Sequence, residues 1–306
     1  MNPPVTAAAR GSGDLVAPAT GSVDSERVGA LPNLIVIGAQ KCGTSGLHYY
    51  LSLHPEVSMS RQKELNFFIA ERNWPRGLDW YRRQFDPTAR VRGEASPNYT
   101  AWPQHDGVPE RIAATVPAAR LIYLVRDPLE RIASHWVHNY AKRREKGSLA
   151  ETLAHPQTSY LSRSHFDAQL ERFRAHFPDR QILVIENDQL RSDRAATLRR
   201  IFEFIGVDPD FEHPQFAAVR HATARKRRST RLGIRVQKLG RSRYGRRIPR
   251  RVWLAADLAL PLAKPIPKPD VRAALAESAP EALESLAADA ARLREATGLD
   301  LAHWSL

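Results

Sequence analysis

The sequence has 306 residues, of which 42 % are hydrophobic and 26 % charged, and its formal net charge is +13. These values are ordinary for a soluble globular enzyme with one sizeable core, or one core with a subdomain. A single cysteine, Cys42, excludes an intramolecular disulfide framework, and no apolar stretch reaches the ~18 residues of a membrane-spanning helix. Because the N-terminus also lacks the basic head and apolar run of a signal peptide, we expect a cytoplasmic protein.

The chain begins with residues 1–30, which are rich in Ala, Gly, Ser and Pro without periodicity and predict a disordered segment. Residues 31–306 then predict one domain. Its first strand is the apolar run 33–38, which ends at a glycine and is typical of a buried parallel strand. A helix is predicted over 44–53, and it ends before Pro55.

Two more buried strands are predicted at 120–125 and 181–185, both apolar and rich in branched side chains. Helical runs accompany them, at 128–140, 166–177 and 195–205. Gly206 is a plausible C-cap for the last of these helices. Strands that alternate with helices predict an α/β fold with a parallel sheet.

The positive charge is concentrated in a basic segment, residues 220–251, which holds 14 Lys or Arg and no Asp or Glu. Since the rest of the chain is close to neutral, this segment predicts an anionic partner at one place on the surface. After a stretch punctuated by prolines, residues 280–297 predict an amphipathic helix. Its acids lie early and its arginines late, as the helix dipole favours.

The strongest functional signal is the loop 38–45, GAQKCGTS, which connects the first predicted strand to the first predicted helix. Two glycines five apart let the backbone curl so that its N–H groups point inward, and the helix adds unpaired N–H groups and the positive end of its dipole. The loop therefore predicts an anion seat formed by Gly38, Gln40, Lys41, Cys42, Gly43, Thr44 and Ser45. The alternative is a tight turn without a ligand.

The position of the lysine separates this loop from an ordinary P-loop. Lysine normally follows the second glycine directly, whereas here Thr44 stands there and Lys41 lies inside the loop. No convincing second acidic motif is present to hold the magnesium ion that phosphoryl transfer normally needs. A sulfuryl group carries one negative charge less than a terminal phosphoryl group, so the pattern favours metal-independent sulfuryl transfer.

These residues resemble a known family. The loop, with LSLHP at 51–55, is similar to the 5′-phosphosulfate loop of sulfotransferases that use 3′-phosphoadenosine 5′-phosphosulfate (PAPS), closest to their heparan sulfate and bacterial branch. The similarity continues through KELNFF at 63–68, GEASPNY at 93–99, LVRDPLERIAS at 124–134, more weakly RSHF at 163–166, and the ending Thr297, Gly298 and Trp304. It covers residues 33–215 and the tail, and implies a P-loop NTPase-like three-layer fold with a central parallel sheet flanked by helices.

The resemblance implies roles on the donor side. Lys41 would contact the oxygen that bridges phosphate and sulfate and would stabilise the leaving phosphate, since a preorganised cation aimed at developing charge is a large catalytic effect. Arg126 and Ser134 would bind the 3′-phosphate, for which the rigid fork of arginine is suited. The alternative for Arg126 is a structural ion pair with a nearby acid, with Ser134 simply packed on its helix.

On the acceptor side, Glu64 matches the family's catalytic glutamate by position and is the candidate general base. It would take the proton from the acceptor hydroxyl; the alternative is a surface glutamate that caps the segment before Phe67. Glu94 is the reserve candidate. Heparan-type relatives often have His where this chain has Asn66 and Lys where it has Ala95, so a heparan-like acceptor does not follow from the resemblance.

Several aromatic, thiol and imidazole side chains have both a functional and a structural interpretation. Phe166 and Tyr160 are predicted near the adenine, with core packing as the alternative. Cys42 occupies a variable position of the motif and is interpreted as filler. His135 and His138 lie three apart on one predicted helix, but no further ligand stands at useful spacing, so no metal site is predicted.

The basic segment has several interpretations. Part of it, Arg225 included, would close over the 3′-phosphate, as basic C-terminal loops do in similar enzymes. Alternatively, it lies on an anionic membrane or is an exposed flexible segment. Nucleic acid ranks last as a partner, because aromatic residues are nearly absent among the basic ones.

The sequence thus predicts an enzyme that transfers a sulfuryl group in line from PAPS to a hydroxyl, less favourably an amine, of a saccharide, lipid or small metabolite. Two other functions stay open. A nucleotide-dependent kinase would bind ATP and need magnesium. A non-catalytic anion- or nucleic-acid-binding protein would act through the basic segment and would tolerate loss of Lys41.

Overall fold

The computed structural model describes residues 29–155, 158–217, 227–229 and 263–306. The predicted disordered segment 1–30 and the basic segment 220–251, Arg225 included, lie almost entirely outside these ranges. Among the helices within them, none has the length and apolar character needed to cross a membrane.

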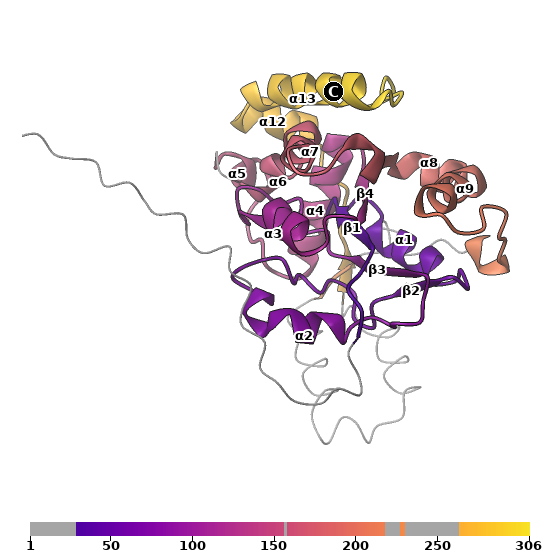
Figure 1. The fold of residues 1–306 in the computed structure, drawn as a ribbon. Coiled ribbons are helices and arrows are strands. Elements are labelled where there is room, and N and C mark those ends of the chain that lie inside the picture. Colours follow the sequence, from indigo (N-terminus) through magenta and orange to yellow (C-terminus); the bar gives the residue numbers. More distant parts are fainter. Residues whose placement is uncertain (1–28, 156–157, 218–226, 230–262) are drawn as a thin grey trace, which may run out of the picture.

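A five-stranded parallel sheet forms the centre of the described structure (Figure 1), with the strand order β2-β3-β1-β4-β5. The strands are β1 Leu34–Gly38, β2 Val57–Met59, β3 Val91–Ala95, β4 Arg120–Val125 and β5 Ile182–Glu186. The predicted α/β fold with a parallel sheet is confirmed, and β1, β4 and β5 lie within one residue of the predicted bounds.

Strand β1 lies between β3 and β4, and all five of its residues are buried. Its unbroken apolar run is what a strand covered on both faces requires. Strand β3, with Gly93 opposite Leu34, has the sequence VRGEA and gave no strand signal because charged residues interrupt it. Since the strands are parallel, the residues that follow them meet at one edge of the sheet, where ligands bind in open α/β folds.

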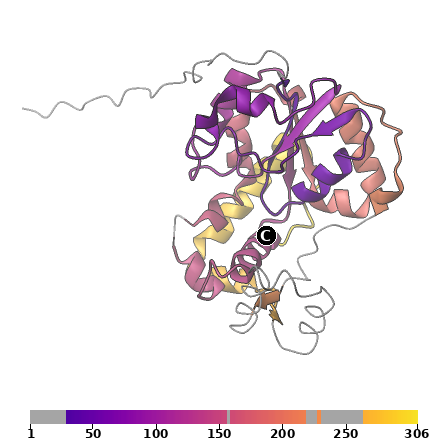
Figure 2. The ribbon, with the colours of Figure 1, turned by 90° about the horizontal axis from the view of Figure 1, so that it is seen from below.

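Helices cover both faces of the sheet, with α8 and α9 on one side and α13 on the other (Figure 2). The five predicted helices correspond to α1 Thr44–Leu51, α4 Pro128–Ala141, α7 Phe166–Arg174, α9 Arg194–Ile205 and α13 Glu281–Thr297. Gly206 ends α9 with a φ of 75°, as predicted for a C-cap. The other helices within the described ranges are α2 Gly77–Arg82, α3 Val108–Thr115, α5 Leu149–Leu153, α6 Ser159–Ser162, α8 Asn187–Ser192 and α12 Val271–Ser278. Short 3₁₀ turns occur at Trp74–Arg76, Asp179–Gln181 and Pro214–Ala217.

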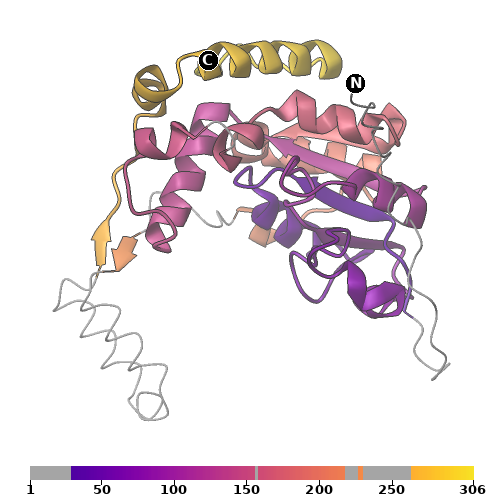
Figure 3. The same cartoon turned by 90° about the vertical axis from the view of Figure 1, so that its left-hand side faces the viewer.

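A second apolar cluster lies beside the sheet, where α4, α5 and α6 pack against α12 and the start of α13. Ile132 of α4, with Leu275 and Leu286 from the C-terminal part of the chain, is completely buried there. This packing fixes α4, the helix that carries Ser134. The short antiparallel ribbon of β6 Arg227–Ser229 and β7 Ala263–Pro265 lies at the same end of the protein (Figure 3).

Candidate active site

The loop 38–45 lies where β1 ends, at the carboxyl edge of the sheet. Both of its glycines are required by neighbouring side chains, because a Cβ at Gly38 would collide with Thr100 and one at Gly43 with Asn187. Gly43 also has a φ of 95°, which residues with a side chain rarely adopt. The two close contacts come from segments that follow β3 and β5, so the sheet fixes the shape of the loop.

Helix α1 begins directly after the loop, and no side chain caps its first turn. The amide groups of Gly43, Thr44 and Ser45 make no hydrogen bond to the described residues. Amides left open at a helix N-terminus carry the positive end of the dipole and bind anions readily. The loop therefore has the donors that the predicted anion seat requires.

Lys41 lines the cleft that the loop borders. Its φ is 77°, a left-handed conformation that costs a residue with a side chain about 1–2 kcal/mol. Such strain persists only where the surrounding structure imposes it, and it clusters at functional sites. The fold thus holds Lys41 in a conformation that its own backbone disfavours.

The cleft has a volume of about 1150 Å³ and runs along the carboxyl edge of the sheet. Its described lining carries only two acids, Glu64 and Glu130, against nine lysines and arginines. The nine cations are Lys41, Arg72, Arg126, Lys142, Arg144, Arg163, Arg191, Arg194 and Lys268. This excess of positive charge focuses an attractive potential on anionic ligands.

Most predicted donor-side residues meet in this cleft. Of the loop, the residues that line it are Gln40, Lys41, Gly43, Thr44 and Ser45. Gly38 and Cys42 are not part of the lining and instead shape the turn. Cys42 is completely buried, and burial raises the pKa of its thiol to about 12, which agrees with its interpretation as filler.

Arg126 and Ser134 both line the cleft, from the end of β4 and from α4. Arg126 donates through Nη2 to Glu130 Oε2 at 2.8 Å, and Lys268 pairs with the other carboxylate oxygen. The Nε of Arg126 is buried and has no hydrogen-bond partner among the described residues. The structural ion pair named above as an alternative is thus present, but it leaves a buried donor that a phosphate oxygen would satisfy.

Glu64 lines the cleft with 47 % of its side chain exposed, and it forms an ion pair of 2.8 Å with Lys63. Its φ of 60° is left-handed. The backbone is held on both sides, because its N–H donates to the carbonyl of Ala95 at 3.1 Å and its carbonyl accepts from Asn66 Nδ2 at 2.7 Å. The two positions that depart from heparan-type relatives therefore support the backbone of the candidate base, whose carboxylate stays accessible to an acceptor.

Glu94, the reserve candidate, has a structural role instead. It is completely buried, and its carboxylate accepts hydrogen bonds from the hydroxyls of Tyr81 at 2.5 Å, Ser96 at 2.6 Å and Tyr99 at 2.8 Å. Burial raises the pKa of Glu94, and the three hydroxyls oppose that rise. Because Glu94 does not line the cleft, it has no route to an acceptor hydroxyl.

Phe166 is also a core residue. It is completely buried and packs edge-on against Tyr123 and Trp304, with ring centroids 6.2 and 5.9 Å away. Since it does not line the cleft, the expected contact with adenine is replaced by the core packing named as its alternative. Tyr160 is likewise buried, and its hydroxyl donates to Glu145 at 2.7 Å.

Arg131 supports the loop 38–45 through a hydrogen bond to its backbone. The sequence motif 124–134 contains Arg131, but no role was predicted for it. It is completely buried, and its Nε donates to the carbonyl of Gln40 at 3.2 Å. Its Nη1 donates to the carbonyl of Tyr160 and to Ser164 Oγ, and its Nη2 lies 2.7 Å from His135 Nδ1. Burial lowers the pKa of Arg131 to about 10, and burial with the nearby Arg131 also lowers the pKa of His135, which is therefore neutral.

Most cations of the cleft could not be found from the sequence, because they stand in segments without a motif. For the cleft cations near Asn187, however, the sequence does contain an indication. This residue follows β5 directly and lines the cleft, and Arg191 and Arg194 come shortly after it. The rule that ligands bind at the carboxyl ends of parallel strands, applied to the third predicted strand, indicates this region.

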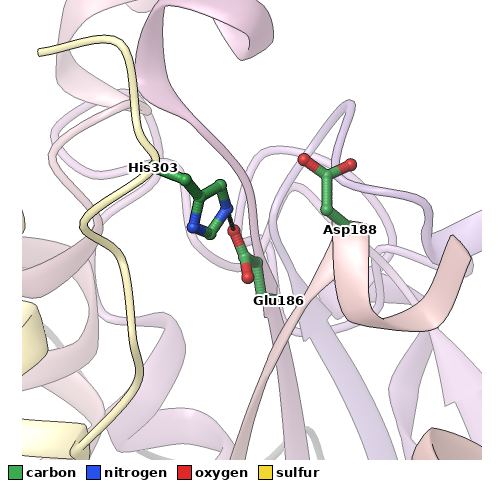
Figure 4. A group of neighbouring side chains, drawn as sticks. All are labelled: Glu186, Asp188 and His303. Carbon is green, nitrogen blue, oxygen red and sulfur yellow. Dashed lines mark hydrogen bonds and ion pairs between the residues drawn. The ribbon is translucent and has the colours of Figure 1, made fainter. Parts of the chain in front are cut away.

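One group of three possible metal ligands occurs in the described ranges, Glu186, Asp188 and His303 (Figure 4). His303 Nε2 lies 2.7 Å from Glu186 Oε1, which also accepts from Trp304 Nε1 at 2.6 Å, and Asp188 pairs with Arg191 at 3.0 Å. Each of the three side chains therefore has a hydrogen-bond or ion-pair partner within the protein. The bonds of His303 and Trp304 to Glu186 attach the C-terminal segment to the end of β5. Neither His135 nor His138 belongs to this group.

The fold and the cleft together define a P-loop-like anion-binding site at the carboxyl edge of a parallel sheet. The sulfotransferase domain family matches residues 31–241. Among curated proteins, bifunctional heparan sulfate N-deacetylase/N-sulfotransferase 2 of Homo sapiens is 29 % identical over 202 residues, which are 58 % of this chain and 22 % of that protein. Heparan sulfate glucosamine 3-O-sulfotransferase 3B1 of Homo sapiens is 32 % identical over 187 residues, 58 % of this chain and 46 % of that protein. The chain thus matches less than half the length of these relatives.

A solved structure agrees with this assignment. The sulfotransferase from Alicyclobacillus acidocaldarius has a TM-score of 0.64 and 26 % identity, and the match covers 90 % of this chain and 100 % of that one. The chain belongs to the sulfotransferase family, as its motifs indicated. The P-loop NTPase-like fold is confirmed.

Proposed function

We propose that the cleft binds PAPS and transfers its sulfuryl group to a hydroxyl of an acceptor that itself carries negative charge. The observation that supports this most strongly is the cleft lining, in which an anion-binding loop and nine cations face only two acids. A kinase would need a magnesium site beside the phosphates. Among the described residues of the lining, Glu130 is the one acid near Arg126, and both of its oxygens are engaged by Arg126 and Lys268.

Each group has a defined task in this proposal. The loop amides and Lys41 bind the phosphosulfate, and Arg126 with Ser134 binds the 3′-phosphate. Glu64 takes the proton of the acceptor hydroxyl while the acceptor oxygen bonds to sulfur. The bond from sulfur to the bridging oxygen breaks, and Lys41 stabilises the negative charge that develops on the leaving 3′-phosphoadenosine 5′-phosphate (PAP).

The charge of the cleft argues for an anionic acceptor. Its described lining has a surplus of seven positive charges, nine against two. PAPS supplies about four negative charges, with about two on the 3′-phosphate, so part of the surplus faces the acceptor. Two relatives are named for heparan sulfate, an acidic saccharide. We therefore place an acidic saccharide first among acceptors, ahead of lipids and small metabolites.

Calorimetric titration tests the donor. We expect wild-type protein to bind PAP without metal and to bind ATP weakly with or without magnesium. Preferential ATP binding that requires magnesium would instead establish the kinase alternative. Transfer of ³⁵S from labelled PAPS to heparan sulfate oligosaccharides, compared with neutral oligosaccharides of equal length, tests the acceptor. Equal labelling of both sets would contradict the anionic acceptor but not the use of PAPS.

Two further proposals rest on sequence alone. We place the protein in the cytoplasm and the basic segment 220–251 in peripheral contact with anionic membranes; those residues lie outside the described ranges almost completely. Cell fractionation tests the location. Sedimentation with phosphatidylserine vesicles, compared with phosphatidylcholine vesicles, tests the contact, and equal recovery in both would exclude it.

A further inference from the structure

Arg163 stands where the donor and acceptor sides of the cleft meet. It follows α6 directly and lines the cleft together with Gln40, Lys41 and Asn98. Only 8 % of the residue is exposed. In the sequence, Arg163 belongs only to the weak motif match at 163–166.

The guanidinium of Arg163 contacts only neutral groups. Nη1 donates to Asn98 Oδ1 at 2.9 Å and to Gln40 Oε1 at 3.2 Å, and Nε donates to Gln104 Oε1 at 3.4 Å. Nη2 makes no hydrogen bond to the residues that the structure describes, and this atom is not fully buried. One nitrogen is therefore left to donate to a ligand in the cleft.

The charge of Arg163 lacks a counter-ion in the described structure. No carboxylate forms an ion pair with it there, and the charges that act on it, from Arg131 and Arg72, are both positive. Burial and these two cations lower its pKa to about 10, so it still carries its proton at neutral pH. A buried cation is costly without an anion, and a bound anion would remove that cost.

The contacts of Arg163 indicate where in the cleft such an anion would bind. On one side, Gln40 belongs to the loop beside Lys41. On the other, Asn98 donates to Asn66 Oδ1 at 3.0 Å, and Asn66 in turn donates to the carbonyl of Glu64. A chain of side chains thus runs from the donor loop through Arg163 to the candidate base. The sulfuryl group must pass between these two ends during transfer.

We propose that Arg163 is a further catalytic residue that binds the sulfuryl oxygens through Nη2 and faces the group as it moves from PAPS to the acceptor. This inference rests on the proposed function. Arg131 is the contrasting case, because all of its nitrogens have partners, it is completely buried and it does not line the cleft. Arg131 is a support of the loop, whereas Arg163 retains a donor.

Comparing PAP with PAPS tests the proposal, because the two nucleotides differ only by the sulfuryl group. Calorimetric titrations without acceptor would use wild-type protein, Arg163→Gln and the control Arg172→Gln, whose arginine lies outside the cleft lining. We expect Arg163→Gln to weaken PAPS binding, or to slow single-turnover transfer from bound PAPS, by about tenfold to a hundredfold, the range for a hydrogen bond to a charged group. PAP binding should change by less than about threefold, and the control should match wild type.

The outcomes separate the inference from the function on which it rests. If wild-type protein binds neither PAP nor PAPS, the proposed function fails. If it binds both, and Arg163→Gln weakens them equally or changes only the acceptor KM, Arg163 does not bind the sulfuryl group. Arg163→Lys, which keeps the charge, should restore part of the lost PAPS discrimination. A fall in thermal stability with unchanged discrimination would likewise overturn the proposal, since it would show a purely structural arginine.

Discussion

The 3′-phosphate site can be tested most sharply through Arg126. Its guanidinium has one nitrogen, Nη2, engaged by Glu130, and a buried Nε without a partner among the described residues. Replacing Arg126 by Gln removes the donors available to a 3′-phosphate. A hydrogen bond to a charged group contributes about 1.5–3 kcal/mol, which corresponds to about tenfold to a hundredfold in affinity.

The assay compares PAP with adenosine 5′-monophosphate, which lacks the 3′-phosphate. Wild-type protein should prefer PAP, and Arg126→Gln should reduce that preference by about tenfold to a hundredfold while affinity for the monophosphate changes little. Arg199→Gln, on the exposed surface of α9, is the control. An unchanged preference in Arg126→Gln would show that its ion pair with Glu130 is its whole role, and the 3′-phosphate would have to bind elsewhere.

Four further predictions concern two acids, a thiol and an imidazole. Glu64→Gln should slow transfer by about 10²–10⁴-fold with little change in Tm, because an exposed ion pair contributes only about 0–1 kcal/mol. Glu94→Gln should do the reverse, lowering stability by about 1–3 kcal/mol with near-normal turnover of folded protein; a matching loss of rate would restore Glu94 as the base. Cys42 should resist iodoacetamide at pH 8 until the protein unfolds, since burial raises its pKa to about 12, and rapid native labelling would contradict its burial. Burial and the nearby Lys63 lower the pKa of His48 to about 4. Because the unfolded chain binds this proton more readily than the folded protein, the free energy of unfolding should be highest above about pH 6.5 and should fall as the pH is lowered toward 4. Denaturant titrations over this pH range should show a smaller fall for His48→Gln than for wild type.

Part of the fold could be predicted because local sequence and global environment agree. The strands β1, β4 and β5 are continuous apolar runs, as a doubly covered parallel strand must be. Strand β3 could not be found, because its Arg92 and Glu94 contradict that pattern. The fold makes a buried Glu94 possible, because hydroxyls from other segments donate hydrogen bonds to its carboxylate. Tyr81 belongs to α2, and Ser96 directly follows β3.

The sequence by itself determined the anion-binding loop, since two glycines, an interior lysine and a following helix are local features whose chemistry needs no distant partner. It also placed Arg126, Ser134 and Glu64 in one site through their motifs. Only the tertiary structure decided that Phe166 packs in the core, that Glu94 has no route to a substrate, and that Arg163 lies between the two sides of the cleft. The physical reason is that burial, accessibility and the sum of charges in a cleft depend on segments that meet in space, and no single segment carries that information.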